Sequence, residues 1–484
     1  MAGIGFRLQK LFQEDYYSSR VKAYGFSLFV TAGPWLVVIL AVTTIRFILS
    51  LFHSISIEEQ RLFTISISYC FIFSQIIYGA LQLIVTRYVA DLLYEQKADK
   101  VFSSFLGMTK ITLFLAIMLW LLFAFFTPLA LYYKIVMLFL FLALNIIWIQ
   151  SIYLTAAKDY QSIALAFLIG SIFSLLGIIL VAYWHPTLGL EHGSALLLLI
   201  SFTLGTFITL VWLSIVIVRM FPNSDATEQF TFLSYLDKYP ELFWSSLFYN
   251  VGIWVCNFVI WFGDGRGNIE DTFIYHQIYD TSVFWAYLSI IPTYIFFVVS
   301  IETRFYERYK KFFGSVNNGG TLHTLLQLKD SMNFVLKQEM ERILRNQGIF
   351  SLLIIFIIWM FSSQSGKTTL NYSILQLTIV GAYANGMVLV ITLLLLYFED
   401  RKGAFRTSAI FFFANLLLSL ILLPFGFNGY GISFAVGSSI TFLYAISRLF
   451  TYIKDIDYYT FCQSNIPIKQ RTFFTKLANK LNGK

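Results

Sequence analysis

The sequence is dominated by apolar segments of roughly 20 residues, the length that a helix needs to cross about 30 Å of hydrocarbon. These segments recur along the whole chain, separated by short stretches of charged or turn-forming residues. Only 12% of the 484 residues are charged, about half of the fraction typical of soluble domains. The pattern predicts an all-α, multi-pass membrane protein and argues against a soluble globular chain.

About twelve segments qualify as membrane-spanning helices, six on each side of a polar interval. The expected spans are 24–50, 63–86, 104–127, 130–155, 161–184, 194–218, 241–262, 281–303, 347–363, 372–398, 404–425 and 430–450. The expected regions are an amphipathic N-terminal segment at 1–23, an N-terminal lobe at 24–218, a linker at 219–240, a C-terminal lobe at 241–450 with a long basic loop at 304–346, and a basic tail at 451–484.

The basic residues predict how the chain is oriented. Nearly all of the 34 Lys and Arg residues fall in segments that this span order places on one side of the membrane. Those on the other side are Arg61, Lys134, Arg266 and Lys367, and Arg46 lies within a span. Because basic loops stay in the cytoplasm, we expect both termini and the linker there. Topology thus accounts for the net charge of +8, and we expect no nucleic-acid partner.

The two halves of the chain match at corresponding helices. Ser27-Leu28-Phe29, Gly33 and Trp35 in the first span align with Ser246-Leu247-Phe248, Gly252 and Trp254 in the seventh. Thr86-Arg87-Tyr88 and Thr303-Arg304-Phe305 align at the ends of the second and eighth spans. The matches predict a parallel repeat, in which two pseudo-symmetric six-helix lobes place a transport pathway between them.

The first fifty residues carry a more specific pattern. They contain Met1-Ala2-Gly3-Ile4-Gly5-Phe6, then Leu8, Lys10 and Leu11, then Ala23-Tyr24-Gly25 and Ala32-Gly33-Pro34-Trp35. This stretch resembles the start of the PelG family of the MOP flippase superfamily, although Arg7 and Gln9 replace an acid and an arginine of the family's opening. The resemblance implies a MOP flippase-like fold in the cytoplasmic (inner) membrane and export of Pel, a galactosamine-type polysaccharide. It also implies a complex with other membrane proteins and a cytoplasmic glycosyltransferase.

Four residues of the first and seventh spans are candidates for the polymer pathway. Trp35 and Trp254 occupy matched positions, and an indole ring can stack on the apolar face of a sugar. The amides of Asn250 and Asn257 can form hydrogen bonds with sugar hydroxyls. Helix packing is the alternative for the tryptophans, and hydrogen bonding between helices is the alternative for the amides.

Three residues are candidate hinges. Pro34 removes a helix hydrogen bond and clashes with the preceding turn, and Gly33 precedes it. Gly252 is the repeat counterpart of Gly33. An ordinary membrane proline, tolerated by neighbouring helices, is the alternative.

Two charged pairs are candidates for a latch between the lobes on the cytoplasmic face. Arg87 with Asp91 and Arg304 with Glu307 have the helical spacing of ion pairs. Simple anchoring of the helix ends at the membrane surface is the alternative.

The favoured function is export of polysaccharide, by alternating access or coupled to synthesis. A flippase for lipid-linked oligosaccharide and a non-transporting scaffold for a polysaccharide synthase remain alternatives. The loop at 304–346 is too small for a nucleotide-binding domain, so we expect no catalytic residue, metal or cofactor. The basic loop and tail suit anionic lipids or a partner protein.

Overall fold

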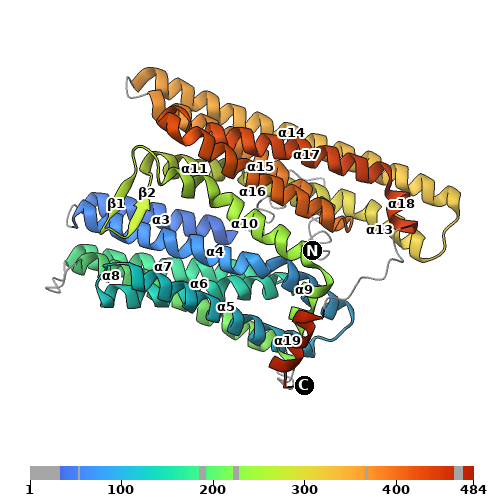
Figure 1. Ribbon diagram of the computed structural model, residues 1–484, viewed down its shortest axis with the longest axis horizontal. Helices are drawn as coiled ribbons and strands as arrows, with labels where there is room; N and C mark the ends of the chain where they lie inside the picture. Colours follow the sequence, from blue (N-terminus) through green and yellow to red (C-terminus); the bar gives the residue numbers. More distant parts are fainter. Residues whose placement is uncertain are drawn as a thin grey trace. The chain divides into compact units, whose positions relative to one another are not determined.

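The computed structural model describes residues 25, 33–52, 55–184, 192–221, 228–365, 369–462 and 472–483. Across these ranges the chain is helical apart from one antiparallel hairpin and the connections (Figure 1). Eleven helices of the described ranges are long and apolar enough to cross a membrane. The prediction of an all-α, multi-pass membrane protein is confirmed. The first expected span, 24–50, corresponds to α3 (Gly33–Phe52). Residues 24 and 26–32 of the expected span lie outside the described part.

The contacts within the chain divide it into two compact units. The N-terminal unit comprises Pro34–Trp254, Arg266–Tyr275 and Pro467–Lys484, and the C-terminal unit comprises Met1–Gly33, Val255–Gly265 and His276–Ile466. One division falls between Gly33 and Pro34, and another falls inside a helix, between Trp254 and Val255. Two segments of the second half of the chain thus belong to the N-terminal unit.

The N-terminal unit is built from spans that α6 and α8 hold together. Its elements are α3, α4 (Ile57–Tyr94), α5 (Asp99–Phe126), α6 (Leu131–Ala156), α7 (Tyr160–Trp184), α8 (Gly193–Met220), η2 (Thr231–Leu233), α9 (Ser234–Lys238), most of α10 (Pro240–Ile260), β1 (Gly267–Ile269), β2 (Phe273–Tyr275) and α19 (Phe473–Leu481). Helix α6 packs against α4, α5 and α8, and α7 packs along α8.

Small residues let α7 and α8 approach closely. A Cβ added at Gly170 would lie 2.0 Å from Oγ1 of Thr209, and one at Gly205 would lie 2.0 Å from Oγ of Ser174. Gly170 and Ser174 are four residues apart on α7, as Gly205 and Thr209 are on α8. This spacing places the small side chains on one face of each helix, the arrangement by which membrane helices pack without a hydrophobic driving force.

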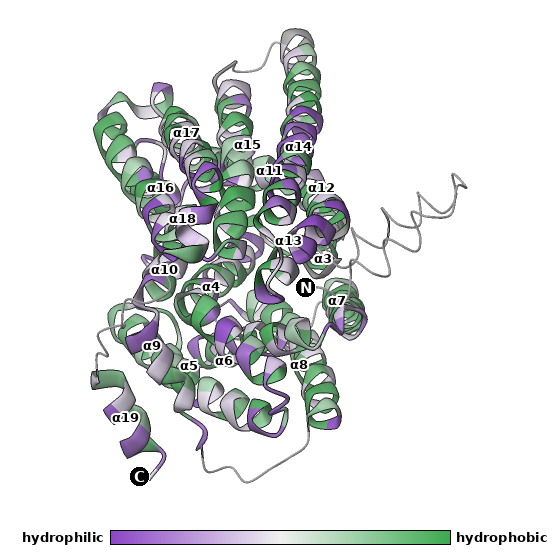
Figure 2. Cartoon of the chain, turned by 90° about the vertical axis from the view of Figure 1, so that its right-hand side faces the viewer, coloured by the Kyte–Doolittle hydropathy of each residue, from purple (hydrophilic) through white to green (hydrophobic). Residues whose placement is uncertain are grey.

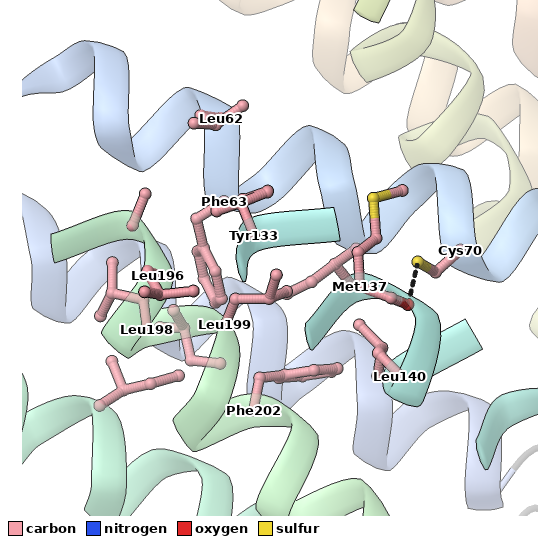
Figure 3. Packing of buried hydrophobic residues seen from close by; sticks show 14 of the residues in the cluster. Leu62, Phe63, Cys70, Tyr133, Met137, Leu140, Leu196, Leu198, Leu199 and Phe202 are labelled. Carbon is pink, nitrogen blue, oxygen red and sulfur yellow. Dashed lines mark hydrogen bonds between the residues drawn. The ribbon is translucent and has the colours of Figure 1, made fainter. Parts of the chain in front are cut away.

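The core of the N-terminal unit lies where α4, α6 and α8 meet (Figure 3). The rings of Phe63 and Phe202 meet edge to face with centroids 6.4 Å apart. The thiol of Cys70 donates to the carbonyl of Met137 at 3.8 Å. Many large apolar side chains of the spans point outward instead, Phe125 among them at 83% exposure, as expected for helices whose outer solvent is lipid.

The hairpin β1–β2, which lies between the expected spans 241–262 and 281–303, is docked on α4. The hydroxyl of Tyr69 donates to the carbonyl of Ile274 at 2.6 Å and accepts from its N–H at 3.1 Å. The buried ring of Phe273 lies 4.9 Å from that of Tyr69, and Glu270 lies 3.3 Å from His192. These contacts explain why residues 266–275 belong to the N-terminal unit.

The C-terminal unit packs around α15, in which 72% of an 18-residue apolar stretch is buried. Its elements are the end of α10, α11 (Gln277–Ser289), α12 (Ile291–Val299), the π-helix η3 (Ser300–Phe305), α13 (Tyr306–Asn317), α14 (Leu322–Ser365), α15 (Thr369–Tyr397), α16 (Arg401–Leu422), η4 (Leu423–Asn428), α17 (Ile432–Lys454) and α18 (Ile456–Phe461). Helix α15 contacts α11, α14, α16 and α17.

The expected basic loop at 304–346 is largely helical. Helix α13 covers part of it, and α14 continues from it into the expected span 347–363 as one helix of 44 residues. Figure 2 shows hydrophilic residues on α13 and along part of α14. A buried stripe at helical spacing holds this part of α14 in place; its residues are Met332, Leu336, Met340 and Ile343.

Candidate functional site around helix α10

Helix α10 carries a stripe of polar and aromatic side chains. Its residues, here called the α10 stripe, are Ser246, Asn250, Trp254, Asn257 and Trp261. Their spacing of four, four, three and four residues places them on one face of a helix. The helix starts at Pro240, where a proline needs no hydrogen-bond partner, and Trp261 extends its last turn by donating from its backbone N–H to the Asn257 carbonyl at 2.9 Å.

The first part of the α10 stripe packs on α4 inside the N-terminal unit. The hydroxyl of Ser246 donates to the carbonyl of Gly79, and the amide of Asn250 donates to the carbonyl of Ser246 at 2.8 Å. A Cβ at Gly79 would lie 2.4 Å from Cγ of Asn250. Only glycine fits this crossing, so Asn250 has a packing role.

The two candidate pathway tryptophans differ in what the structure shows. The indole N–H of Trp254 donates to Oε1 of Gln75 on α4 at 3.3 Å, and its side chain is partly buried. The side chain of Trp35, like that of Pro34, lies outside the described residues. Trp254 therefore has a partner within its own unit, and a shared polymer surface with Trp35 remains a prediction.

The last part of the α10 stripe surrounds the carboxylate of Asp280 inside the C-terminal unit. Oδ1 of Asp280 accepts from Nδ2 of Asn257 at 2.8 Å and from Nε1 of Trp261 at 3.0 Å. Oδ2 accepts from the same indole at 3.0 Å and from the backbone N–H of His276 at 2.9 Å. Every one of these donors is neutral, and Asp280 lies in the first turn of α11, where the helix dipole favours negative charge.

A second layer holds His276 in place. Its ring accepts from the backbone N–H of Tyr279 at 3.1 Å, capping α11, and its other nitrogen lies 2.9 Å from the carbonyl of Asp264. The hydroxyl of Tyr430 donates to the same carbonyl at 3.1 Å.

Asp280 lies one residue before the expected span, which begins at Thr281, so the expected spans alone do not single it out. In the structure Asp280 lies within the candidate span Gln277–Val299. One sequence feature points to Asp280. Asn257 and Trp261 are four residues apart and so share a helix face, and the connection after them leads directly to Asp280 at the start of the next span. The donors around Asp280 and the N-terminus of α11 together stabilise its charged carboxylate.

The candidate hinges lie at the divisions between the units. Gly33 is the last residue of its segment of the C-terminal unit, and Pro34 is the first of the N-terminal unit. Gly252 is buried within continuous α10, two residues before the division at Trp254.

Three of the candidate latch residues, Arg87, Asp91 and Arg304, form ion pairs inside their own units. Nε of Arg87 lies 3.2 Å from Oδ1 of Asp91, whose Oδ2 accepts from the hydroxyl of Tyr235 at 2.9 Å. Burial and this hydrogen bond raise the pKa of Tyr235 well above its ordinary value. Arg304 pairs at 3.1 Å with Glu339, a residue outside the candidate latch. A latch between the lobes, including a role for Glu307, remains a prediction.

No group of three or more metal-binding side chains occurs among the described residues. The chain contains one Asp-x-Asp sequence within the described ranges, at Asp455-Ile456-Asp457, and such a pair can hold a sugar-nucleotide metal. In the structure the ammonium of Lys329 bonds Asp457, and Asp455 is the N-cap residue of α18.

Comparisons with known proteins identify the family. Residues 1–461 match the family described as "PelG: Putative exopolysaccharide Exporter (EPS-E)". The chain belongs to the PelG family. No curated protein matches the chain.

Solved structures place the PelG-family chain in the MOP fold. A mutant of the Vibrio cholerae MATE transporter VcmN shares 12% identity, with a TM-score of 0.60 over 90% of this chain and 98% of that one. An outward-facing multidrug resistance MATE transporter of the MOP superfamily gives 0.59 at 12% identity, over 89% and 96%. A MOP superfamily transporter from Pyrococcus furiosus gives 0.56 at 11% identity, over 89% and 96%. At these identities the likeness shows the fold alone.

Proposed function

We propose that this chain exports a Pel-type exopolysaccharide across the cytoplasmic membrane, by movement of its two units against each other. The observation that carries the proposal is the PelG match over residues 1–461. The MOP-type fold supports it, because that fold is shared with transporters. The expected orientation, with both termini in the cytoplasm, is part of the proposal.

The positions of the hinge residues support a moving mechanism. Gly33 and Gly252 are repeat-related, and one division between the units falls directly after Gly33 while another falls after Trp254, two residues beyond Gly252. A glycine or proline at such a point lowers the cost of bending a helix. We propose that these residues absorb the bend when the units move.

Of the four candidate pathway residues, we keep only the two tryptophans as the proposed polymer surface. Asn250 and Asn257 form hydrogen bonds within the chain, which favours a positioning role for both. Trp254 and Trp35 remain the proposed aromatic surface for sugar rings. A cytoplasmic glycosyltransferase and other membrane proteins of a synthesis complex are the proposed partners.

The test uses cells that make the polymer and lack this chain. Reintroducing the wild-type chain should restore secreted polymer, whereas Gly252→Leu, which stiffens and crowds α10, should lower secretion and raise polymer inside the cell. The matched control is Gly348→Ala in α14, where an added Cβ would first meet Tyr383 at 3.7 Å, an ordinary contact. Secretion that does not depend on the chain would refute the proposal.

The same experiment separates the alternatives. A scaffold would restore secretion equally with wild type and with a well-folded Gly252→Leu chain. A flippase for lipid-linked oligosaccharide would leave glycolipid, rather than free polymer, inside cells that lack it.

A further inference from the structure

Helix α19, in the tail, is bound to the linker by polar contacts on one face. Oδ2 of Asp237, which is 6% exposed, accepts from the backbone N–H of Thr475 at 2.7 Å and from its hydroxyl at 2.8 Å. Oδ1 of Asn482 accepts from the backbone N–H of Phe230 at 3.0 Å. Ala478, between them on the same face, is buried. The helix therefore has a fixed orientation within the N-terminal unit.

The part of the linker that binds α19 lies beside the end of α4 and the start of α5. Tyr235 of α9 bonds Asp91 near the end of α4 and packs its ring 5.1 Å from that of Tyr88. Lys100, in the first turn of α5, pairs with Glu228 at 2.7 Å. Helix α19 contacts η2 and α9, and Figure 1 shows it running across the direction of α4 and α5. Because spanning helices end near the boundary between hydrocarbon and headgroups, we place α19 close to that boundary.

The opposite face of α19 is apolar and exposed to different degrees along its length. Phe473, Leu477 and Leu481 follow each other at four-residue spacing, with exposures of 70%, 37% and 47%. Lys476 and Lys480 flank this stripe on the adjoining face and are exposed. Figure 2 shows the resulting mixture of hydrophobic and hydrophilic residues on α19.

We propose that α19 is an interfacial helix that binds anionic lipid. Its apolar stripe enters the boundary between headgroups and acyl chains, and its two lysines pair with lipid phosphates. Charge complementarity favours a lipid surface over an apolar protein groove, because both lysines can extend toward the headgroups while their stems cover apolar surface. Through Thr475 and Asn482, lipid binding would hold the linker at the membrane. The proposal needs only the membrane-spanning fold and is independent of polymer export.

The test places a nitroxide on the full-length chain in nanodiscs. Cys70 and Cys256 are buried, so replacing the exposed Cys462 with serine leaves Leu477→Cys as the labelling site. In an equal mixture of phosphatidylcholine and phosphatidylglycerol, the label should be reached by oxygen and protected from a nickel chelate. The control is Asn479→Cys, exposed on another face of the same helix, which should show the reverse preference.

Charge reversal and lipid composition test the role of the lysines. With Lys476→Glu and Lys480→Glu together, or in phosphatidylcholine alone, the inserted fraction should fall, because two lysines favour an anionic surface by about thirtyfold. An unchanged melting temperature checks that the variant is folded. A Leu477 label open to the nickel chelate in both lipids would overturn the proposal and indicate a protein partner. Equal insertion in both lipids and in the charge-reversed variant would overturn the anionic-lipid assignment.

Discussion

Replacing Gly79 with alanine should destabilise the N-terminal unit, because the crossing of α4 and α10 has no room for a methyl group. The new Cβ would lie 2.4 Å from Cγ and 2.8 Å from Cβ of Asn250. Both distances are much shorter than the separation of about 3.5–4.0 Å at which two carbon atoms attract each other best. Either the helices separate or Asn250 leaves its hydrogen bond to Ser246. Overpacking costs about 1–3 kcal/mol, partly offset by up to about 1 kcal/mol from alanine in a helix.

The assay is thermal unfolding in detergent, followed with a thiol-reactive fluorophore. Cys70 and Cys256 are buried and react only when the chain opens, and the exposed Cys462 is replaced by serine in every variant. Gly348→Ala is the control, since its Cβ has space. We expect Gly79→Ala to lower the melting temperature and Gly348→Ala to leave it unchanged or raise it.

A double-mutant cycle shows whether Asn250 causes the effect. Asn250→Gly removes the side chain that an alanine at position 79 would strike, so the double variant should be more stable than the sum of the two single changes predicts. The coupling should approach the overpacking cost of about 1–3 kcal/mol. Effects that add to within about 0.5 kcal/mol would refute this account of the crossing.

Three further variants test other contacts. Tyr69→Phe removes both hydrogen bonds to Ile274 and should speed hydrogen exchange in the docked hairpin; unchanged exchange would show that the bonds do not hold it. Asp280→Asn cannot accept from all of its present donors and should cost about 1.5–3 kcal/mol, seen as earlier labelling of buried thiols; wild-type labelling would contradict the geometry. Glu339→Gln removes the charge of a carboxylate that is 3% exposed and bonds Arg304 at 3.1 Å; its melting temperature should fall, and no change would indicate that the pair behaves as an exposed one.

Apolar runs were sufficient to predict the fold class, because a lipid-facing helix must be apolar over its whole crossing. They could not predict where a helix continues into water. Helix α14 starts 25 residues before the expected span at 347 because a buried stripe, rather than a continuous apolar run, supports its first part. The docking of the hairpin was also beyond the sequence, since it depends on Tyr69, about 200 residues away.

The same limit applies to the candidate site. The contact of Arg87 with Asp91 could be predicted because both lie on one helix face. The contact of Arg304 with Glu339 joins η3 to α14. It could not be predicted from helical spacing, because the two residues lie on different helices. Asp280 was overlooked because polar residues near a span end look like ordinary loop residues until a neighbouring helix supplies their partners.

The most direct test of the export proposal is reconstitution of the purified chain in sealed vesicles. The cognate glycosyltransferase and its sugar nucleotide are supplied outside, on the side of the vesicle that carries the tail. Polymer protected from added glycosidase should accumulate in the lumen only when this chain is present, and less of it should accumulate with Gly252→Leu. Protected polymer at the same level in vesicles without the chain would contradict the proposal that it forms the route across the membrane.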